Sequence, residues 1–319
     1  MRPRSAIDTA CFPPEWIERL QIAVSGRRLG RWYVTREEFV AQTLDKGQFG
    51  LEVGPSYNPT LRRADGWNVE TIDHASADEL REKYAHMIDT SQVEDVDYIS
   101  DARPMHEVIA RRGEYDFIFA SHVIEHIPDM IGFFQSCEQL LKPAGRLILV
   151  VPDKRRCFDV MQARTMTGDI LEAHRQGATR HSPGRAFDFL SNRADMGGHQ
   201  IWESHWAQKF NLSFHFSQTI EQAKQAYDEA VNGADYVDIH AWRFVPSSFR
   251  SIMQDLERLE MTKLREVFFE STNRCEFYFT ASPGGAGCPL DRMGLNKAIA
   301  LEEIEGLMQI AASPMPAFT

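Results

Sequence analysis

Short apolar runs alternate with longer amphipathic stretches between residues 49 and 152, and this alternation limits the possible fold more than any other feature. Strands that alternate with helical patterns, here at 76–88 and 130–145, predict βαβ units and a parallel sheet. The run "RLILVV" is apolar on both faces, as a central buried strand requires. The five runs are "FGLEVG" (49–54), "NVETID" (68–73), "VDYISD" (96–101), "YDFIFAS" (115–121) and "GRLILVVP" (145–152).

Later segments complete the sheet. A helix is predicted at 246–259, followed by strands at 264–270 and 275–281 that are joined by the short link "STNR". A link of this length favours a hairpin, so the last strand should be antiparallel. We therefore expect an α/β fold: a Rossmann-like, doubly wound, mostly parallel seven-stranded sheet with an antiparallel last strand.

The remaining segments suggest additions around this sheet. Residues 1–48 read as a helical N-terminal extension, and the central domain spans 49–283. Within it, residues 157–235 are rich in Arg, His and Trp and break the alternation, which predicts an insertion that covers the substrate side of the sheet. Residues 284–319 form a C-terminal tail with a helix at 295–312.

Charge and composition narrow the partners. The formal net charge is −11, which makes the surface a poor match for nucleic-acid phosphate or anionic lipid. We expect a small-molecule, glycan or protein substrate and no nucleic acid; a homo-oligomer is compatible with the sequence. The sequence has no apolar run of 18 residues, so no membrane span is predicted. No secretory signal is evident. The five cysteines are scattered, which predicts free thiols in a reducing, cytoplasmic location.

The turn after the first strand suits a nucleoside better than a phosphate. "LEVGPSYNP" contains only Gly54, followed by Pro55, which has no N–H to offer to a phosphate. The second strand ends at Asp73, where a carboxylate can accept hydrogen bonds from two ribose hydroxyls. The third ends at Asp101, which could bind an adenine amino group. With Glu52 in the first strand, this pattern describes an adenosine with a cationic or neutral tail.

The motifs, in this order, resemble a known family. "LEVGPS", "ETIDH", "YISD", "FIFASHVIEHIPD" and "LLKPAGRLILVVPD" resemble class I S-adenosylmethionine-dependent methyltransferases, in particular the branch whose fourth strand ends S-H-x-x-E-H. "VPDKRRCFD" and the later "HAWRFVPSSF" (240–249) are similar to methyltransferases of bacterial polysaccharide and glycan pathways. The resemblance implies S-adenosyl-L-methionine as cofactor, S-adenosyl-L-homocysteine as product, and O-methylation of a sugar or a glycan-pathway intermediate.

The resemblance also assigns site residues. Ser56 and Asn58 replace the second and third glycines that the family usually has in the first turn. A hydroxyl acceptor is a weak nucleophile and needs a base within hydrogen-bond reach, for which the candidates are His122, Asp153 and His240. The implied cofactor-binding residues are Glu52, Gly54, Pro55, Ser56, Asp73, His74, Asp101, Ala102, Ser121 and His122.

The motif "SHVIEH" leaves alternatives open. Its H-x-x-E-H spacing is that of a zinc-peptidase helix written in reverse, but a zinc site needs a helical context and a third ligand. Because His122 follows the strand-like run "FIFA", we expect it on the floor of the cleft, with Glu125 and His126 starting the next helix and no metal. A magnesium site is a lesser alternative. Three other functions also remain open. The chain could be a catalytically silent binding module, a hydrolase that uses this cluster, or a methyltransferase that acts on another small molecule or on a protein.

Overall fold

The computed structural model describes residues 35–86, 89–202, 213–233, 237–272 and 274–311. Most of the predicted helical extension over 1–48 lies outside these ranges. Its described part is helix α2 (Arg36–Thr43), which begins with a capping box: the side chain of Thr35 accepts from the N–H of Glu38, whose carboxylate accepts from the N–H of Thr35. This reciprocal pair satisfies two donors that the first turn of a helix leaves without partners.

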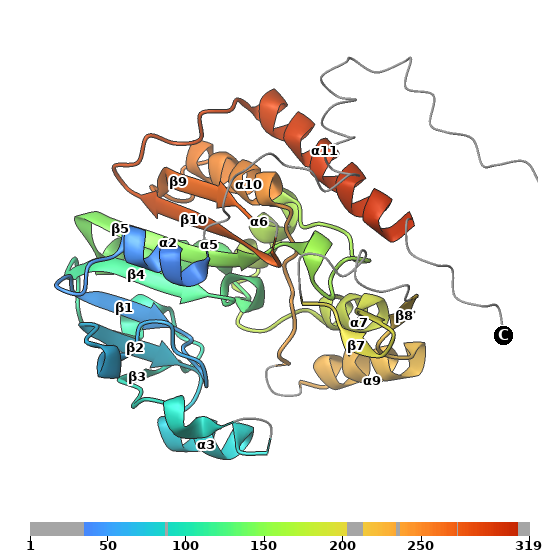
Figure 1. Ribbon diagram of the computed structural model, residues 1–319, viewed down its shortest axis with the longest axis horizontal. Coiled ribbons are helices and arrows are strands. Elements are labelled where there is room, and N and C mark those ends of the chain that lie inside the picture. The colour runs from blue at the N-terminus through green and yellow to red at the C-terminus, as the bar shows by residue number, and fades with distance from the viewer. Residues whose placement is uncertain (1–34, 87–88, 203–212, 234–236, 273, 312–319) are drawn as a thin grey trace, which may run out of the picture.

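A seven-stranded sheet forms the centre of the molecule, in the order β3-β2-β1-β4-β5-β10-β9 (Figure 1). Strands β1 to β5 pair in parallel, whereas β10 is antiparallel to both β5 and β9. The predicted mostly parallel sheet with an antiparallel last strand is thus confirmed. The strands are β1 (Gly50–Val53), β2 (Val69–Asp73), β3 (Tyr98–Ile99), β4 (Tyr115–Ser121), β5 (Leu141–Pro152), β9 (Arg265–Ser271) and β10 (Glu276–Ser282).

The order of the strands creates a switch point. From β1 the chain moves outward through β2 to β3, then returns to the other side of β1 to form β4 and β5. The connections therefore diverge between β1 and β4, and the carboxyl ends of the strands at such a point form a crevice in which α/β proteins bind ligands.

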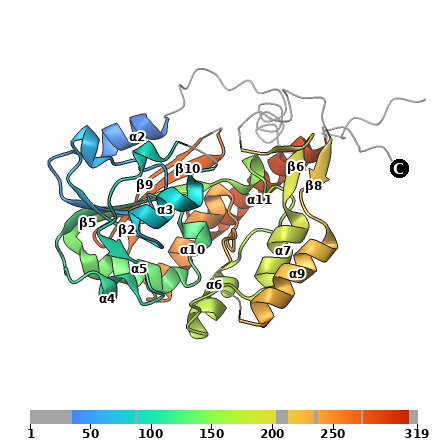
Figure 2. The same ribbon diagram turned by 90° about the horizontal axis from the view of Figure 1, so that it is seen from below.

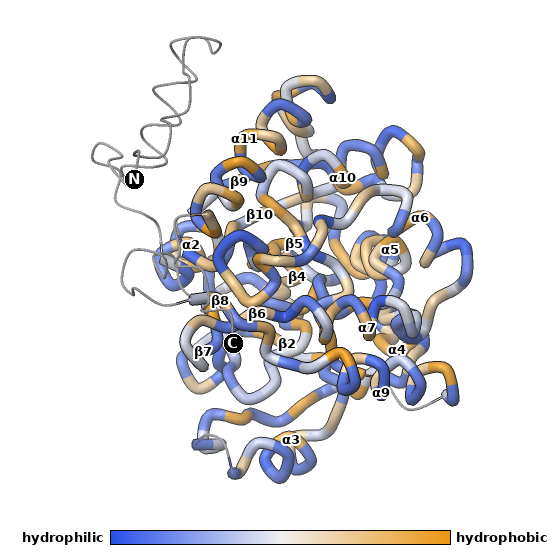
Figure 3. Tube along the Cα trace, turned by 90° about the vertical axis from the view of Figure 1, so that its right-hand side faces the viewer, coloured by the Kyte–Doolittle hydropathy of each residue, from blue (hydrophilic) through white to orange (hydrophobic). Residues whose placement is uncertain are grey.

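Both faces of the sheet are covered. Alternate residues of β4 enter different cores: Phe117 and Phe119 join the cluster that contains Phe39 of α2, whereas Ile118 and Ala120 join the larger cluster with α5 and α10. Figure 2 shows α2 on one side of the sheet and α5 and α10 on the other. Burial on both faces explains why most of β4 and the second half of β5 are apolar, and Figure 3 shows hydrophobic stretches gathered on β4, β5, β10 and α5.

The helices around the sheet match the predictions with two corrections. The helix predicted at 130–145 ends at Leu140 and β5 starts at Leu141, because Pro143 cannot continue the i→i−4 ladder of a helix. Glu125 and His126 lie in a 3₁₀ turn (Ile124–His126) rather than at the start of a helix. The helices are α3 (Ala77–Tyr84), α4 (Met105–Val108), α5 (Met130–Leu140), α10 (Pro246–Arg258) and α11 (Arg292–Ala311).

The described part of 157–235 forms a unit of helices and short strands that packs on the main sheet, since Ile170 and Phe189 belong to the same core cluster as β4. Its helices are α6 (Thr167–Arg175), α7 (Pro183–Asn192) and α9 (Ile220–Val231). They accompany a three-stranded sheet of β6 (Ala194–Met196), β7 (His199–Gln200) and β8 (Phe214–Phe216) in the order β7-β6-β8. Trp202 connects this unit to the main sheet, since its ring lies 5.2 Å from that of His122 just after β4.

Two further observations bear on expectations from the sequence. None of the described helices combines the length and the apolar character that a bilayer crossing requires. Cys137, Cys157, Cys275 and Cys288 are free thiols, as predicted, whereas Cys11 lies outside the described residues.

Candidate active site

The turn after β1 is built around Gly54. Its φ is +64°, and a Cβ at this position would lie 2.8 Å from Cγ2 of Val123, so that a side chain would meet both backbone strain and a steric clash. After Pro55, the backbone of Ser56 also has a positive φ, +49°. The N–H of Ser56 donates to Oδ2 of Asp73 at 2.7 Å. The turn after β1 is therefore locked onto the end of β2.

Asp73 presents a buried carboxylate at the carboxyl end of β2. Its residue is only 3% exposed, and Oδ1 accepts from the backbone N–H of His74 at 2.7 Å and from Nδ1 of the same residue at 2.6 Å. The His74 side chain is half exposed, so it covers the carboxylate from the solvent side. If the imidazole moved away, the two backbone donors would still hold the carboxylate while acceptor positions opened toward the crevice.

Glu52 and Asp101 lie at the same edge but are engaged differently. Both oxygens of Glu52 accept backbone N–H groups of the following loop, from Thr60 at 2.8 Å and Leu61 at 3.1 Å. Burial raises the pKa of Glu52 to about 7 in spite of these two bonds. Asp101 is exposed and pairs with Arg103, which lowers the pKa of Asp101. Glu52 thus fastens the loop that lines the crevice, and Asp101 stands at its rim beside Ala102.

Ser121 and His122 end β4 next to Gly54. The Oγ of Ser121 is buried and makes no hydrogen bond to any described residue. His122 has a φ of +54°, and its Nε2 lies 2.8 Å from Oε2 of Glu276 on β10. Arg36 of α2 forms an ion pair with the same carboxylate. Burial alone would lower the pKa of His122, but the carboxylates of Glu125 and Glu276 raise it above its usual value.

These features fit an adenosyl cofactor. The fitting elements are the turn at Gly54 with no room for a side chain, the buried carboxylate of Asp73 at the end of β2, and the buried hydroxyl of Ser121 at the end of β4, which has no hydrogen-bond partner among the described residues. S-adenosylmethionine would be held by the turn around Gly54, by Asp73 and by the floor at Ser121 and His122. It would supply the methyl group as a reactive sulfonium.

His240 is the predicted base with the most suitable surroundings. It is 4% exposed, and its Nδ1 lies 2.6 Å from Oδ2 of buried Asp159. The other oxygen of Asp159 accepts from Gln162 at 2.6 Å. The carboxylate thus fixes the orientation of the imidazole and leaves Nε2 facing Oε1 of Glu125 at 4.0 Å. A histidine held in this way can accept a proton at Nε2 or bind a cation there.

Asp153 lies in a separate ion network. It is 1% exposed, and both of its oxygens accept from the guanidinium of Arg155. Arg155 and Arg156 also pair with Glu305 of α11. Burial would raise the pKa of Asp153, but Arg155 outweighs burial and lowers it. The structure therefore brings His122 and His240 together around Glu125, and places Asp153 where it anchors α11.

Several residues of the site were not anticipated. Asp159 ends the motif "VPDKRRCFD", so its proximity to the other motifs was a usable signal. No sequence signal pointed to Glu276 or Asp238, because they reach the site from distant parts of the chain. Asp238 pairs with His126 at 2.8 Å. Aromatic rings surround His240, with centroid distances of 4.6 Å for Phe158, 5.9 Å for Phe189 and 6.3 Å for Trp202.

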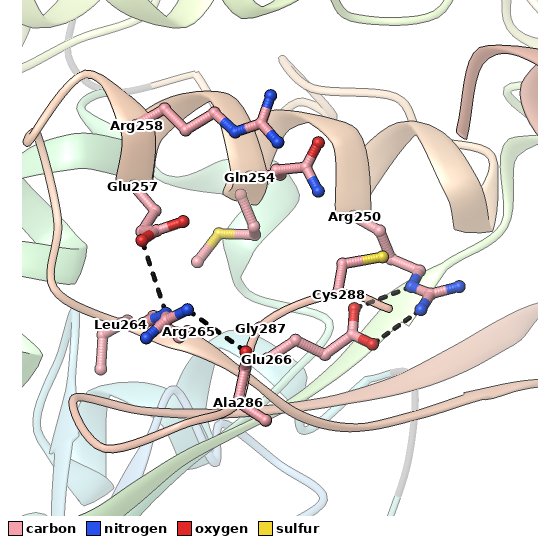
Figure 4. A pocket seen from close by; sticks show the side chains of 11 residues that line it. Arg250, Gln254, Glu257, Arg258, Leu264, Arg265, Glu266, Ala286, Gly287 and Cys288 are labelled. Atoms are coloured by element: carbon pink, nitrogen blue, oxygen red, sulfur yellow. Dashed lines mark hydrogen bonds and ion pairs between the residues drawn. The ribbon is translucent and has the colours of Figure 1, made fainter. Parts of the chain in front are cut away.

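A pocket between α10 and β9 offers a different kind of surface (Figure 4). The guanidinium of Arg250 donates twice to Glu266 at 2.7 Å, and Arg265 lies 3.4 Å from Glu257. These charges already neutralise one another. The pocket lies at the β9 edge, separated from β1 by β4, β5 and β10, so it does not contribute to the crevice at the switch point.

Comparisons with known proteins agree with this geometry. Residues 33–255 match a sequence family described as a methyltransferase domain. None of the curated proteins compared with the chain matches it. An S-adenosylmethionine-dependent methyltransferase from Aquifex aeolicus is 13% identical over 85% of this chain and 98% of its own, with a TM-score of 0.38. The CcbJ methyltransferase from Streptomyces caelestis is 13% identical over 77% and 87%, with a TM-score of 0.40.

The chain is also similar to a Galdieria sulphuraria protein, with 18% identity over 44% of this chain and a TM-score of 0.29. It spans only 60% of the length of that protein. The TM-scores of these three structures are 0.40 or lower, so their similarity in fold to this chain is weak. The matched family covers most of the chain and includes β1 to β5, the switch point and His240, but not β9 and β10. The chain belongs to the methyltransferase-domain family, and this family implies S-adenosylmethionine as its cofactor.

Proposed function

We propose that this chain transfers a methyl group from S-adenosylmethionine to a hydroxyl oxygen of a saccharide, which can be free, nucleotide-linked or lipid-linked. One observation carries the proposal. The ring of His240, oriented by Asp159 at 2.6 Å, lies 4.7 Å from that of His126 in the turn after β4 and 4.6 Å from that of Phe158 in the 157–235 region. Because this turn follows β4 at the same edge of the sheet as Gly54 and Asp73, the position of His240 supports a role in removing the acceptor proton.

The residues of the chain divide the work of the reaction. Asp73 and the turn at Gly54 hold the nucleoside, so the reacting methyl is presented to the acceptor in one orientation, which supplies much of the rate enhancement. The acceptor oxygen forms the new bond to the methyl carbon while the bond to sulfur breaks, and the sulfur keeps the electron pair. The hydroxyl proton leaves toward His240. Removal of this proton is needed because a neutral hydroxyl is a poor nucleophile.

The surroundings of His240 suit a hydroxyl-rich ring. Trp202 is partly buried and stacks on Phe158 with a centroid distance of 5.3 Å, which offers an aromatic face beside the histidines. Arg193 lies over the ring of Phe158 at 4.7 Å, and Arg185 over that of Trp242 at 4.0 Å. Aromatic walls with a few placed polar groups are typical of small-molecule sites. The resemblance of "VPDKRRCFD" to glycan-pathway enzymes supports the same class of acceptor.

An acceptor screen tests the proposal. The purified protein is incubated with S-adenosylmethionine and with saccharides, amines, phenols and peptides, and release of S-adenosylhomocysteine is measured. We expect turnover with saccharides. His240→Ala should lower kcat by roughly 10²–10⁴-fold and leave cofactor affinity near that of the wild type, whereas His174→Ala, in a histidine–carboxylate pair outside the site, should not. Methylation of an amine or a peptide but of no saccharide would refute the acceptor class.

A catalytically silent binding module is the second candidate, and one observation favours it. His74 covers Asp73, whose side chain is only 1% exposed, so the ribose position is closed in this conformation. A silent module of this kind would show no turnover with any acceptor while still binding the cofactor or a partner. Turnover in the screen would exclude it.

A further inference from the structure

Glu125 lacks a hydrogen-bond partner that its burial demands. It is fully buried, and neither carboxylate oxygen makes a hydrogen bond to any residue in the described ranges. Buried polar groups nearly always have such a partner, and a buried charge without one costs several kcal/mol. The backbone carbonyl of Glu125 accepts from the N–H groups of Ala241 and Trp242. The residue is therefore held firmly in place, beside the segment that carries His240.

Imidazole nitrogens surround this carboxylate at a distance too long for hydrogen bonds. From Oε1 of Glu125, Nδ1 of His122 lies at 3.6 Å, Nε2 of His126 at 3.8 Å and Nε2 of His240 at 4.0 Å. One ligand atom each from Glu125, His126 and His240 lies within 4.8 Å of the other two, and His122 falls outside this set. Nitrogen and oxygen ligands bind zinc at about 2.0–2.2 Å. Ligands around one ion are therefore roughly 3–3.5 Å apart, and a small contraction would suffice.

Each histidine is also held from behind by its own carboxylate. Nδ1 of His240 lies 2.6 Å from Asp159, and Nδ1 of His126 lies 2.8 Å from Asp238. This places the ring proton on the outer nitrogen and directs the lone pair of the inner nitrogen toward Glu125. Metal-binding histidines are usually oriented in this way. A carboxylate behind each ring is harder to explain if the histidines only neutralise Glu125.

We infer that Glu125, His126 and His240 form a binding site for one divalent first-row transition-metal ion beside the methyl-transfer crevice. Two imidazoles with one carboxylate suit ions such as Mn²⁺, Co²⁺ and Zn²⁺, whereas Mg²⁺ and Ca²⁺ prefer oxygen ligands. Three protein ligands leave coordination positions open, as in catalytic rather than structural metal sites.

The role of the ion rests on the proposed function. A hydroxyl oxygen that occupies an open position would lose its proton more readily, because a divalent ion lowers the pKa of a bound oxygen ligand. His240 would then act as a ligand instead of the base, and the proton of the ion-bound hydroxyl would pass to water. Binding of the ion requires neither acceptor nor cofactor, so it can be measured alone.

Metal titration of the full chain tests the inference. Chelator-treated, desalted protein is titrated with Co²⁺, followed by visible absorption, and with Zn²⁺ and Mn²⁺, followed by calorimetry. We expect one ion per chain. Glu125→Gln and His240→Ala should weaken binding at least tenfold, whereas His174→Ala should bind like the wild type. Circular dichroism checks the fold. His126 is about one quarter exposed, so His126→Ala provides a third variant that disturbs packing least and should show the same loss.

Two results would overturn the site. One is the absence of saturable binding of all three ions to the wild-type protein. The other is unchanged affinity in folded Glu125→Gln, His126→Ala and His240→Ala proteins, which would place the ion elsewhere. Binding of S-adenosylmethionine is measured on the same chelated sample. Cofactor binding without ion binding would contradict only the metal site, and ion binding without cofactor binding would contradict only the proposed function.

Discussion

Replacement of Asp73 by alanine should weaken the binding of S-adenosylmethionine by roughly 10- to 150-fold. Two ribose hydroxyls donating to the carboxylate would contribute roughly 1.5–3 kcal/mol each. The wild type must first break the hydrogen bond between Asp73 and Nδ1 of His74, which is 2.6 Å long in this conformation. This bond also has the Asp73 carboxylate as acceptor, so it offsets one of the two ribose hydrogen bonds. One such bond remains as the net gain, and roughly 1.5–3 kcal/mol corresponds to this range of affinity.

Calorimetric titration with the cofactor and with S-adenosylhomocysteine measures the effect. Asp116→Ala is the matched control, since Asp116 also accepts a backbone N–H and pairs with Lys142, but lies at the amino end of β4 on the opposite edge of the sheet. Its affinity should equal that of the wild type. The reasoning would be refuted by a folded Asp73→Ala protein that binds the cofactor as tightly as the wild type does.

His74→Ala provides a test of opposite sign. If the imidazole only competes with the ribose for Asp73, its removal should tighten cofactor binding, because the bond at 2.6 Å no longer has to be broken. Weaker binding in this variant would show instead that His74 itself contacts the nucleoside, as the sequence predicted.

Two further predictions concern stability. The pKa of Glu52 is about 7 in the folded state against 4.5 for the free group, so the folded state holds the proton more tightly. The free energy of unfolding should therefore fall by about 3 kcal/mol as pH rises from 4.5 to 7. Denaturant titrations should find this slope in the wild type and not in Glu52→Gln. Arg155→Ala removes the closest partner of buried Asp153 and should cost about 3–5 kcal/mol. Arg103→Ala breaks an exposed pair and should leave the melting temperature near that of the wild type. Equal melting temperatures of the two variants would contradict this reasoning.

The fold was predictable because burial on both faces leaves a local trace. β4 and the second half of β5 are nearly continuous apolar runs, and the ends of the strand-like runs mark the carboxyl edge on which Gly54, Asp73 and His122 lie. The exact start of β5 was not predicted, since "LLKPAG" reads as a helix until Pro143 is weighed as a stop. Local patterns therefore located the cofactor crevice but placed one boundary wrongly.

The surroundings of the histidines could not be predicted in the same way. His122 and Glu276 are 154 positions apart, and His240 and Asp159 are 81 apart. Neither pair follows a period of 2 or 3.6, so no pattern within one element indicates it. H-x-x-E-H suggested a helix with a metal, and the strand before it argued against that. The structure has a 3₁₀ turn and no α-helix at Ile124–His126, yet His240 approaches Glu125 from a distant part of the chain.

The position of β10 has a consequence for how the enzyme reaches its working form. β10 is the last of the seven strands along the described chain, yet it lies inside the sheet, between β5 and β9. The β9–β10 hairpin closes a short loop and can form early, but its docking on β5 spans more than 120 residues of chain, which makes this the slow kind of contact. That docking also brings Glu276 to His122. A chain in which this hairpin has not yet docked would therefore lack the carboxylate that holds His122, so the site would be completed only in the last step of sheet assembly.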